Sequence, residues 1–92
     1  MAEVFLSPEI AFPQYERLRG DPSRRKVLER VDEILDALET DPGQAWLRVH
    51  RFQRPPLWCV KFDASGEAWA ILWYDGEDDR VLVDYMGSAS FT

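Results

Sequence analysis

Residues 27–38, Val-Leu-Glu-Arg-Val-Asp-Glu-Ile-Leu-Asp-Ala-Leu, decide the class of fold. The apolar side chains in this stretch recur at positions 27, 28, 31, 34, 35 and 38, which places them on one stripe of an α-helix. Most of the charged side chains fall on the other side of that helix. Asp21 and Pro22 are a suitable cap and first residue, and the turn at 41–43 ends the helix. The stretch therefore predicts one long amphipathic helix.

A short strand and a first helix precede this stretch. Residues 3–6 (Glu-Val-Phe-Leu) predict a strand that ends at Ser7. A proline in a helix interior breaks a backbone hydrogen bond, so the helix that follows is expected over residues 12–19, with Pro13 in its first turn. Gly20 then ends this first helix.

After residue 44 the apolar period changes to 2, which is typical of strands. Strands are expected over residues 45–52, 57–62, 68–74 and 80–86, with turns at 63–66 and 75–79. Short connections between these strands predict an antiparallel meander. The fold expected for residues 1–92 is therefore a single α+β domain with an N-terminal strand, a two-helix hairpin and the meander. Two helices that precede a meander cover only one face of its sheet.

The strand over 68–74 is apolar at every position. One side of it carries Ala68, Ala70, Leu72 and Tyr74, and the other carries Trp69, Ile71 and Trp73. A strand with one side in water should alternate between apolar and polar residues. The tail of the chain, a second copy or a different protein must therefore cover the face without helices. Trp69 and Trp73 are expected to contribute to such a binding surface.

The chain is acidic overall but basic in one segment. With 11 Lys and Arg against 17 Asp and Glu, its formal net charge of −6 weighs against a general binder of nucleic acids or anionic membranes. Residues 44–62 contain no acid, and they carry Arg48, His50, Arg51, Arg54 and Lys61. This segment either binds phosphate or carboxylate groups, or pairs with the acidic helix or the acidic turn at 75–79.

The residues for metal or nucleophilic chemistry are few. His50 is the only histidine, so it is either a lone general base beside Arg48 and Arg51 or a strand residue without a chemical role. Cys59 is the only cysteine, which excludes an intramolecular disulfide, and it is expected to pack among apolar neighbours. We expect no metal and no cofactor. We also expect no membrane contact, since no apolar run approaches about 18 residues. These features predict a soluble, cytoplasmic protein.

Several motifs, in their order and spacing, resemble the RelE/ParE superfamily of toxins from toxin–antitoxin systems. The similarity spans nearly the whole chain. Its motifs are residues 5–9 (Phe-Leu-Ser-Pro-Glu), residues 35–38 with Asp41 and Pro42, residues 57–61 (similar to the family's LWRIR strand), residues 70–74 (similar to YRVIYE) and residues 81–87 (similar to the last strand and its GHR end).

The resemblance implies a small α+β toxin that is held by a cognate antitoxin protein. RelE-like members cleave mRNA on the ribosome without a metal, using Lys, Arg and often a C-terminal Tyr or His, whereas ParE-like members poison DNA gyrase. A RelE-like activity would use Arg48, His50, Arg51 and Lys61 as catalytic residues, with Arg54 on RNA phosphate.

The chain departs from the family at three positions. The central-strand arginine of the family aligns with about Ala70, and the basic residue after the last strand aligns with Ser88 or Ala89. The C-terminal aromatic aligns with Phe91, which has no hydroxyl for proton transfer and is assigned to binding. Two hypotheses follow: a toxin component that acts as a metal-independent endoribonuclease, or a non-catalytic interaction module on the same fold. The module's partner would be an antitoxin-like peptide, a second copy in a homodimer, or an unrelated protein.

Overall fold

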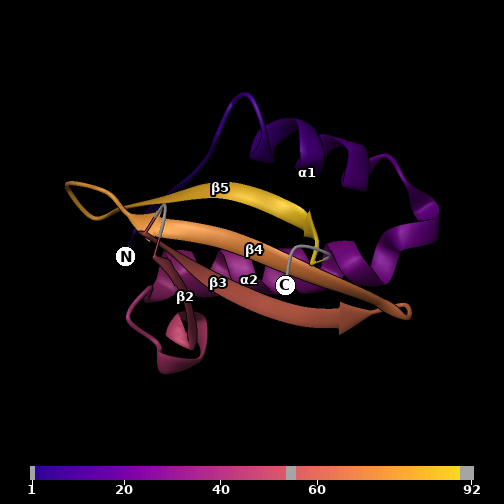
Figure 1. Ribbon diagram of the computed structural model, residues 1–92. Helices are drawn as coiled ribbons and strands as arrows, with labels where there is room; N and C mark the ends of the chain where they lie inside the picture. Colours follow the sequence, from indigo (N-terminus) through magenta and orange to yellow (C-terminus); the bar gives the residue numbers. More distant parts are fainter. Residues whose placement is uncertain (1, 54–55, 90–92) are drawn as a thin grey trace.

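The structure is a computed structural model that describes residues 2–53 and 56–89. Its elements are β1 (Glu3–Leu6), α1 (Ala11–Arg19), η1 (Pro22–Arg24), α2 (Arg25–Thr40), η2 (Ala45–Arg48), β2 (His50–Gln53), β3 (Pro56–Ala64), β4 (Glu67–Asp75) and β5 (Arg80–Ser88). Figure 1 shows this order along the chain. The predicted α+β class, with a strand and two helices before the remaining strands, is confirmed.

The five strands form one mixed sheet in the order β1-β5-β4-β3-β2. Strands β2 to β5 pair antiparallel with their neighbours in the sequence, as the predicted meander requires. Strand β1 adds to the far side of β5 in parallel, with Val4 opposite Val81 and Leu6 opposite Val83. Its carboxyl end is tied to β5 because Ser7 Oγ donates to the carbonyl of Asp84 at 3.1 Å.

Side-chain hydrogen bonds lie at the start of α1 and at the start of the short turn before α2. The Ala11 N–H donates to Ser7 Oγ at 2.8 Å, and α1 starts there, one residue before the predicted start. Asp21 accepts the N–H of Ser23 at 3.0 Å and opens η1, the single 3-10 turn before α2. The predicted cap therefore begins a short 3-10 turn, and the α-helix proper starts at Arg25.

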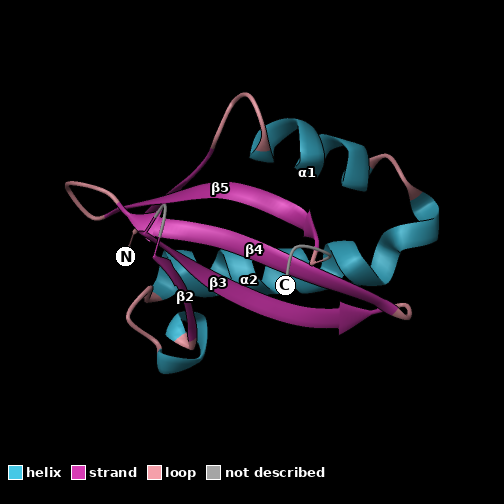
Figure 2. Ribbon diagram, in the orientation of Figure 1, coloured by secondary structure: helices cyan, strands magenta, loops and turns pink. Residues whose placement is uncertain are grey.

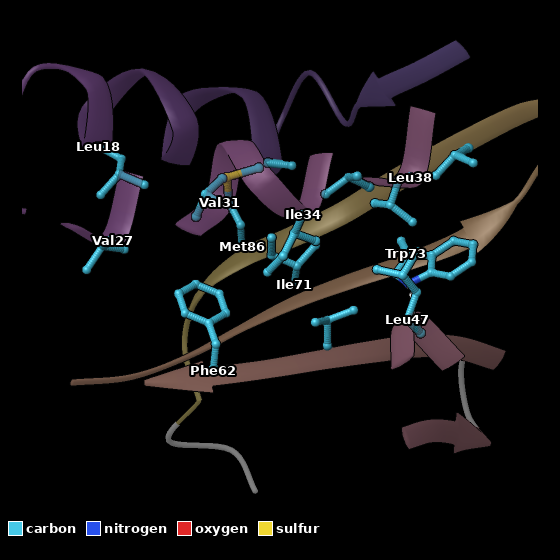
Figure 3. Close-up of a cluster of buried hydrophobic side chains, with 14 of the residues drawn as sticks. Leu18, Val27, Val31, Ile34, Leu38, Leu47, Phe62, Ile71, Trp73 and Met86 are labelled. Carbon is cyan, nitrogen blue, oxygen red and sulfur yellow. Dashed lines mark hydrogen bonds between the residues drawn. The ribbon is translucent and has the colours of Figure 1, made fainter. Parts of the chain in front are cut away.

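The two helices cover one face of the sheet, as predicted. In Figure 2, α2 crosses behind β3 and β4, and α1 lies along β5. Val27, Val31, Ile34 and Leu38 of the apolar stripe are fully buried, and Figure 3 shows their side chains pointing toward those of the sheet. The main core contains Val27, Val31, Ile34 and Leu38 from α2, and Val60, Phe62, Ile71, Trp73, Val81, Val83 and Met86 from the strands. We call this the helix side of the sheet, and the other face the open side.

The prediction of one strand over 45–52 is wrong in its first half. Residues 45–48 form the 3-10 turn η2, and only His50–Gln53 belong to a strand. The reason is Leu47, which is fully buried and whose carbonyl accepts the Trp73 Nε1–H at 3.1 Å. A helical turn here places both the side chain and the carbonyl of Leu47 in the core. An extended backbone, with side chains alternating at the surface, would not place both there.

Gly66 gives a test of the β3–β4 turn. Ser65 and Gly66 both have positive φ, at 54° and 76°, as a two-residue hairpin loop requires. Replacing Gly66 by alanine should lower the free energy of unfolding by about 1 kcal/mol through backbone strain, since a Cβ there would meet nothing within 4 Å. Urea denaturation measures the change. The control is Gly20→Ala, where φ is −86° and the space is adequate; equal losses in both variants would contradict this interpretation.

Tyr15 makes stability depend on alkaline pH. Its hydroxyl donates to Asp32 Oδ1 at 2.7 Å and joins α1 to α2. Burial, followed by the bond to that carboxylate, raises the pKa of Tyr15 from 10.0 to about 12. The folded state therefore favours the protonated phenol, so this contribution is complete below pH 10 and is lost as the pH rises toward 12. We expect urea midpoints to fall across this range, and to fall less in Tyr15→Phe than in the control Tyr74→Phe.

Candidate functional site

The sheet separates the residues that the sequence assigned to one catalytic site. Arg51 is opposite Trp58 in the β2–β3 register and lies on the helix side. His50 is opposite Cys59, and Lys61 is two residues along from Cys59, so both belong to the open side. Arg48 and Arg51 come together around Trp58, but His50 and Lys61 do not join them. The four residues do not form one site.

Arg48 makes internal contacts. Its Nε donates to the Pro42 carbonyl at 2.7 Å, and its Nη2 lies 3.0 Å from both carboxylate oxygens of Asp75. The guanidinium carbon is 5.2 Å from the Trp58 ring centre and 5.0 Å from that of Trp73. For Arg48, the alternative of pairing with the acidic turn is therefore the correct one. This side chain is 28% exposed, and its ion pair with Asp75 links η2 to the end of β4.

The other cationic side chains of residues 44–62 that the structure describes make fewer internal contacts than Arg48. Arg51 is exposed, and its guanidinium carbon lies 4.5 Å from the Trp58 ring centre. His50 and Lys61 are also exposed, and across residues 2–53 and 56–89 none of these three forms an ion pair. The predicted binding residues Arg54 and Phe91 lie outside the described residues.

The two tryptophans of β4 face the helices. Trp73 is 0% exposed within the main core, so the prediction that it contributes to a partner-binding surface is wrong. Trp69 is half-buried against the same core, with the Arg24 guanidinium carbon 5.9 Å from its ring centre. The side of β4 that carries Trp69, Ile71 and Trp73 faces the helices, because α2 covers the sheet there. The face that needs another cover is the one with the smaller side chains.

The middle of the open side is already closed. Ala70 and Leu72 are buried there with Leu57, Cys59 and Ala89, and Tyr85 packs against them. The Ala89 N–H donates to the carbonyl of Ala68 at 3.0 Å, so the beginning of the tail is part of the cover. Cys59 is fully buried, and burial raises the pKa of its thiol. Its position agrees with the packing role expected for it.

An uncovered apolar region remains at the β1 end of the open side. Phe5, Leu82 and Tyr74 are opposite one another on β1, β5 and β4. Phe5 is 43% exposed, Tyr74 is 38% exposed, and Leu82 is half-buried between them. With Arg80 and Asp84 they line a hollow of about 280 Å³, which we call the aromatic groove. The groove was not predicted from the sequence, because its walls come from strands whose pairing depends on where β1 joins the sheet.

A second hollow, of about 320 Å³, opens where α1 and η1 meet the end of β5. Several of its polar side chains are engaged with each other or with the backbone, whereas the buried Nε1–H of Trp69 has no hydrogen-bond partner among the described residues. Arg24 is bound to Asp21 and Glu67, and these two carboxylates raise its pKa. Gln14 accepts the N–H of Met86 at 2.8 Å. This hollow is a weaker candidate for a site than the aromatic groove.

Two kinds of feature are absent from residues 2–53 and 56–89. In that part of the chain, His, Cys, Asp and Glu nowhere gather in a group of three or more that could hold a metal ion. Within the same residues, both helices are too short or too polar to cross a membrane.

Comparisons of the chain with known protein families, with curated proteins and with solved structures found no match.

Proposed function

We propose that this chain is a RelE/ParE-like toxin-fold protein of the cytoplasm that acts by binding a partner protein through the open side of its sheet. The observation that carries the proposal is the aromatic groove, an apolar surface with exposed rings that the described part of the chain leaves uncovered. The order of the elements supports the relationship, because it is the order that the resemblance implies. An antitoxin-like protein is the partner that the resemblance suggests.

The composition of the groove suits a protein interface. Aromatic and arginine side chains are enriched at the centres of interfaces, where they supply most of the binding energy. The groove offers Phe5 and Tyr74 with Arg80 beside them, and the Arg80 guanidinium carbon lies 5.6 Å from the Phe5 ring centre. An apolar partner segment on this surface would remove both rings from water.

The arrangement of cations argues against RNA cleavage as the main activity. A metal-free nuclease must direct several cations at the phosphate that gains charge in the transition state. Arg48 is instead bound to Asp75, and the exposed cations Arg51 and Lys61 lie on opposite faces of the sheet.

Co-expression with the protein encoded by the adjacent reading frame tests the proposal. We expect the two proteins to purify as a complex, and the complex to be lost in Tyr74→Asp. The control is Val49→Asp, because Val49 is exposed but does not line the groove. Retention of the complex in Tyr74→Asp, or its equal loss in both variants, would count against the open side as the binding surface.

Cleavage of mRNA is the second candidate function, and the exposed Arg51 favours it. Its guanidinium is stacked on Trp58 and, among described residues, has no acidic partner. Inducing the chain alone while following growth and message integrity separates the two functions. Cleavage that disappears in Arg51→Glu and persists in Tyr74→Asp would establish the nuclease and reject the interaction module.

A further inference from the structure

We propose that, in the absence of another partner, the aromatic groove binds a second copy of this chain to form a twofold-symmetric dimer. The pair would be centred on Leu82, with Arg80 of each copy against Asp84 of the other. This inference rests on the proposed function, since it names an occupant for the same open surface.

The charges along β5 are complementary to themselves. Arg80 and Asp84 both line the groove, one on each side of Leu82. Among the residues that the structure describes, neither side chain has an ion-pair partner. A second β5 lying antiparallel across the first would place an acid opposite a base at both ends. Because a strand rises about 3.3 Å per residue, the two ion pairs would be about 13 Å apart.

Alternation along β5 puts Asp84 on the same face as Arg80 and Leu82, and a break in the sheet register there changes the faces of the residues that follow. Leu72 is opposite Tyr85 and Trp73 is opposite Val83, so Asp84 is the extra residue of a bulge. The side chain of Asp84 lines the groove with Leu82, and the bulge returns Met86 to the core on the helix side. Strict alternation along β5 would instead have placed Met86 on the same face as Arg80 and Leu82.

The apolar contacts would follow the same symmetry. Because Phe5 and Tyr74 are level with Leu82, the twofold axis would bring each of these three residues against its own counterpart. Packed sheets lie about 10 Å apart, a gap that two layers of side chains fill. The groove occupies only the β1 end of the open side, so the interface would be smaller than the roughly 800 Å² per partner that a standard interface buries.

The overall charge limits how strong this association can be. Each chain carries a formal net charge of −6, so two copies repel one another at long range. We therefore expect a weak, concentration-dependent dimer that a better-matched partner would displace from the groove.

Charge exchange within the groove is the decisive test, with sedimentation equilibrium of the full chain as the measurement. Arg80→Glu and Asp84→Arg should each weaken self-association about tenfold or more, because like charges then face each other. The double variant should recover the wild-type association, since both ion pairs re-form with reversed polarity. An equimolar mixture of the two single variants should form a heterodimer, because one groove is then wholly acidic and the other wholly basic.

Matched controls remove the effect of net charge. Arg51→Glu and Asp63→Arg make the same charge changes on exposed residues that do not line the groove, and they should leave self-association unchanged. A monomer at every concentration, or single variants that associate like the wild type, would overturn the dimer. If the chain is monomeric and Tyr74→Asp still abolishes the complex with the adjacent-frame protein, then the dimer fails while the proposed function stands.

Discussion

Replacing Trp73 by alanine should lower the free energy of unfolding by about 3–5 kcal/mol, the usual loss for removing a large buried aromatic side chain. Trp73 is the largest fully buried side chain and lies between the sheet and α2. Its Nε1–H also donates to the carbonyl of Leu47, so the substitution leaves that buried acceptor unpaired. Domains of this size have about 5–14 kcal/mol in total, so the variant should be marginally folded in urea titrations followed by circular dichroism.

The adjacent residue provides the matched control. Tyr74 is on the same strand but on the opposite face, and it is 38% exposed. Tyr74→Ala should therefore cost less than about 1 kcal/mol, as is usual at the surface. Similar losses for Trp73→Ala and Tyr74→Ala would mean that β4 is covered on both faces, and the aromatic groove would then not be an open surface.

Replacing Arg48 by methionine should lower stability by about 1–2 kcal/mol, because methionine keeps much of the side chain's packing but loses the bonds to Asp75 and to the Pro42 carbonyl. Asp75 is 48% exposed, so its ion pair with Arg48 contributes at most about 1 kcal/mol, and the bond to the Pro42 carbonyl and the stacking on the aromatic rings each add roughly 0.5–1 kcal/mol. Arg48→Lys should recover little of the loss, because an ammonium group cannot reproduce the planar contacts with Trp58 and Trp73. Urea midpoints measure both variants.

Arg51→Met is the comparison for this prediction. Arg51 touches the same Trp58 ring, but it is exposed and none of the ion pairs between described residues includes it. Its removal should cost less than about 1 kcal/mol. A larger loss for Arg51→Met than for Arg48→Met would reverse our assignment, leaving Arg48 as the cation available to a ligand.

Local patterns in the sequence were sufficient for much of the fold. The apolar stripe over 27–38 predicted α2 because an apolar period of 3.6 sustained over three turns is typical of an amphipathic helix and of little else. The turn at 63–66 was predictable because Gly66 accepts a positive φ without strain. The order of strands β2 to β5 followed from their short connections.

Features that depend on distant contacts could not be predicted in this way. Residues 45–48 turn helically because Trp73, far along the chain, needs the carbonyl of Leu47. An apolar strand such as β4 does not reveal which of its faces meets the helices, so the two tryptophans were assigned to the wrong surface. The candidate site depends on β1 pairing beside β5, and that pairing leaves no local signal in the sequence.

The solitary thiol beneath the open side gives the molecule a built-in reporter. Cys59 is wholly enclosed, and burial raises the pKa of its thiol, so alkylating reagents reach its sulfur only when β3 separates from its neighbours. The rate of alkylation therefore measures how often the centre of the sheet opens, without any engineered label. Any occupant of the groove that steadies the sheet would be visible as slower modification of this one sulfur.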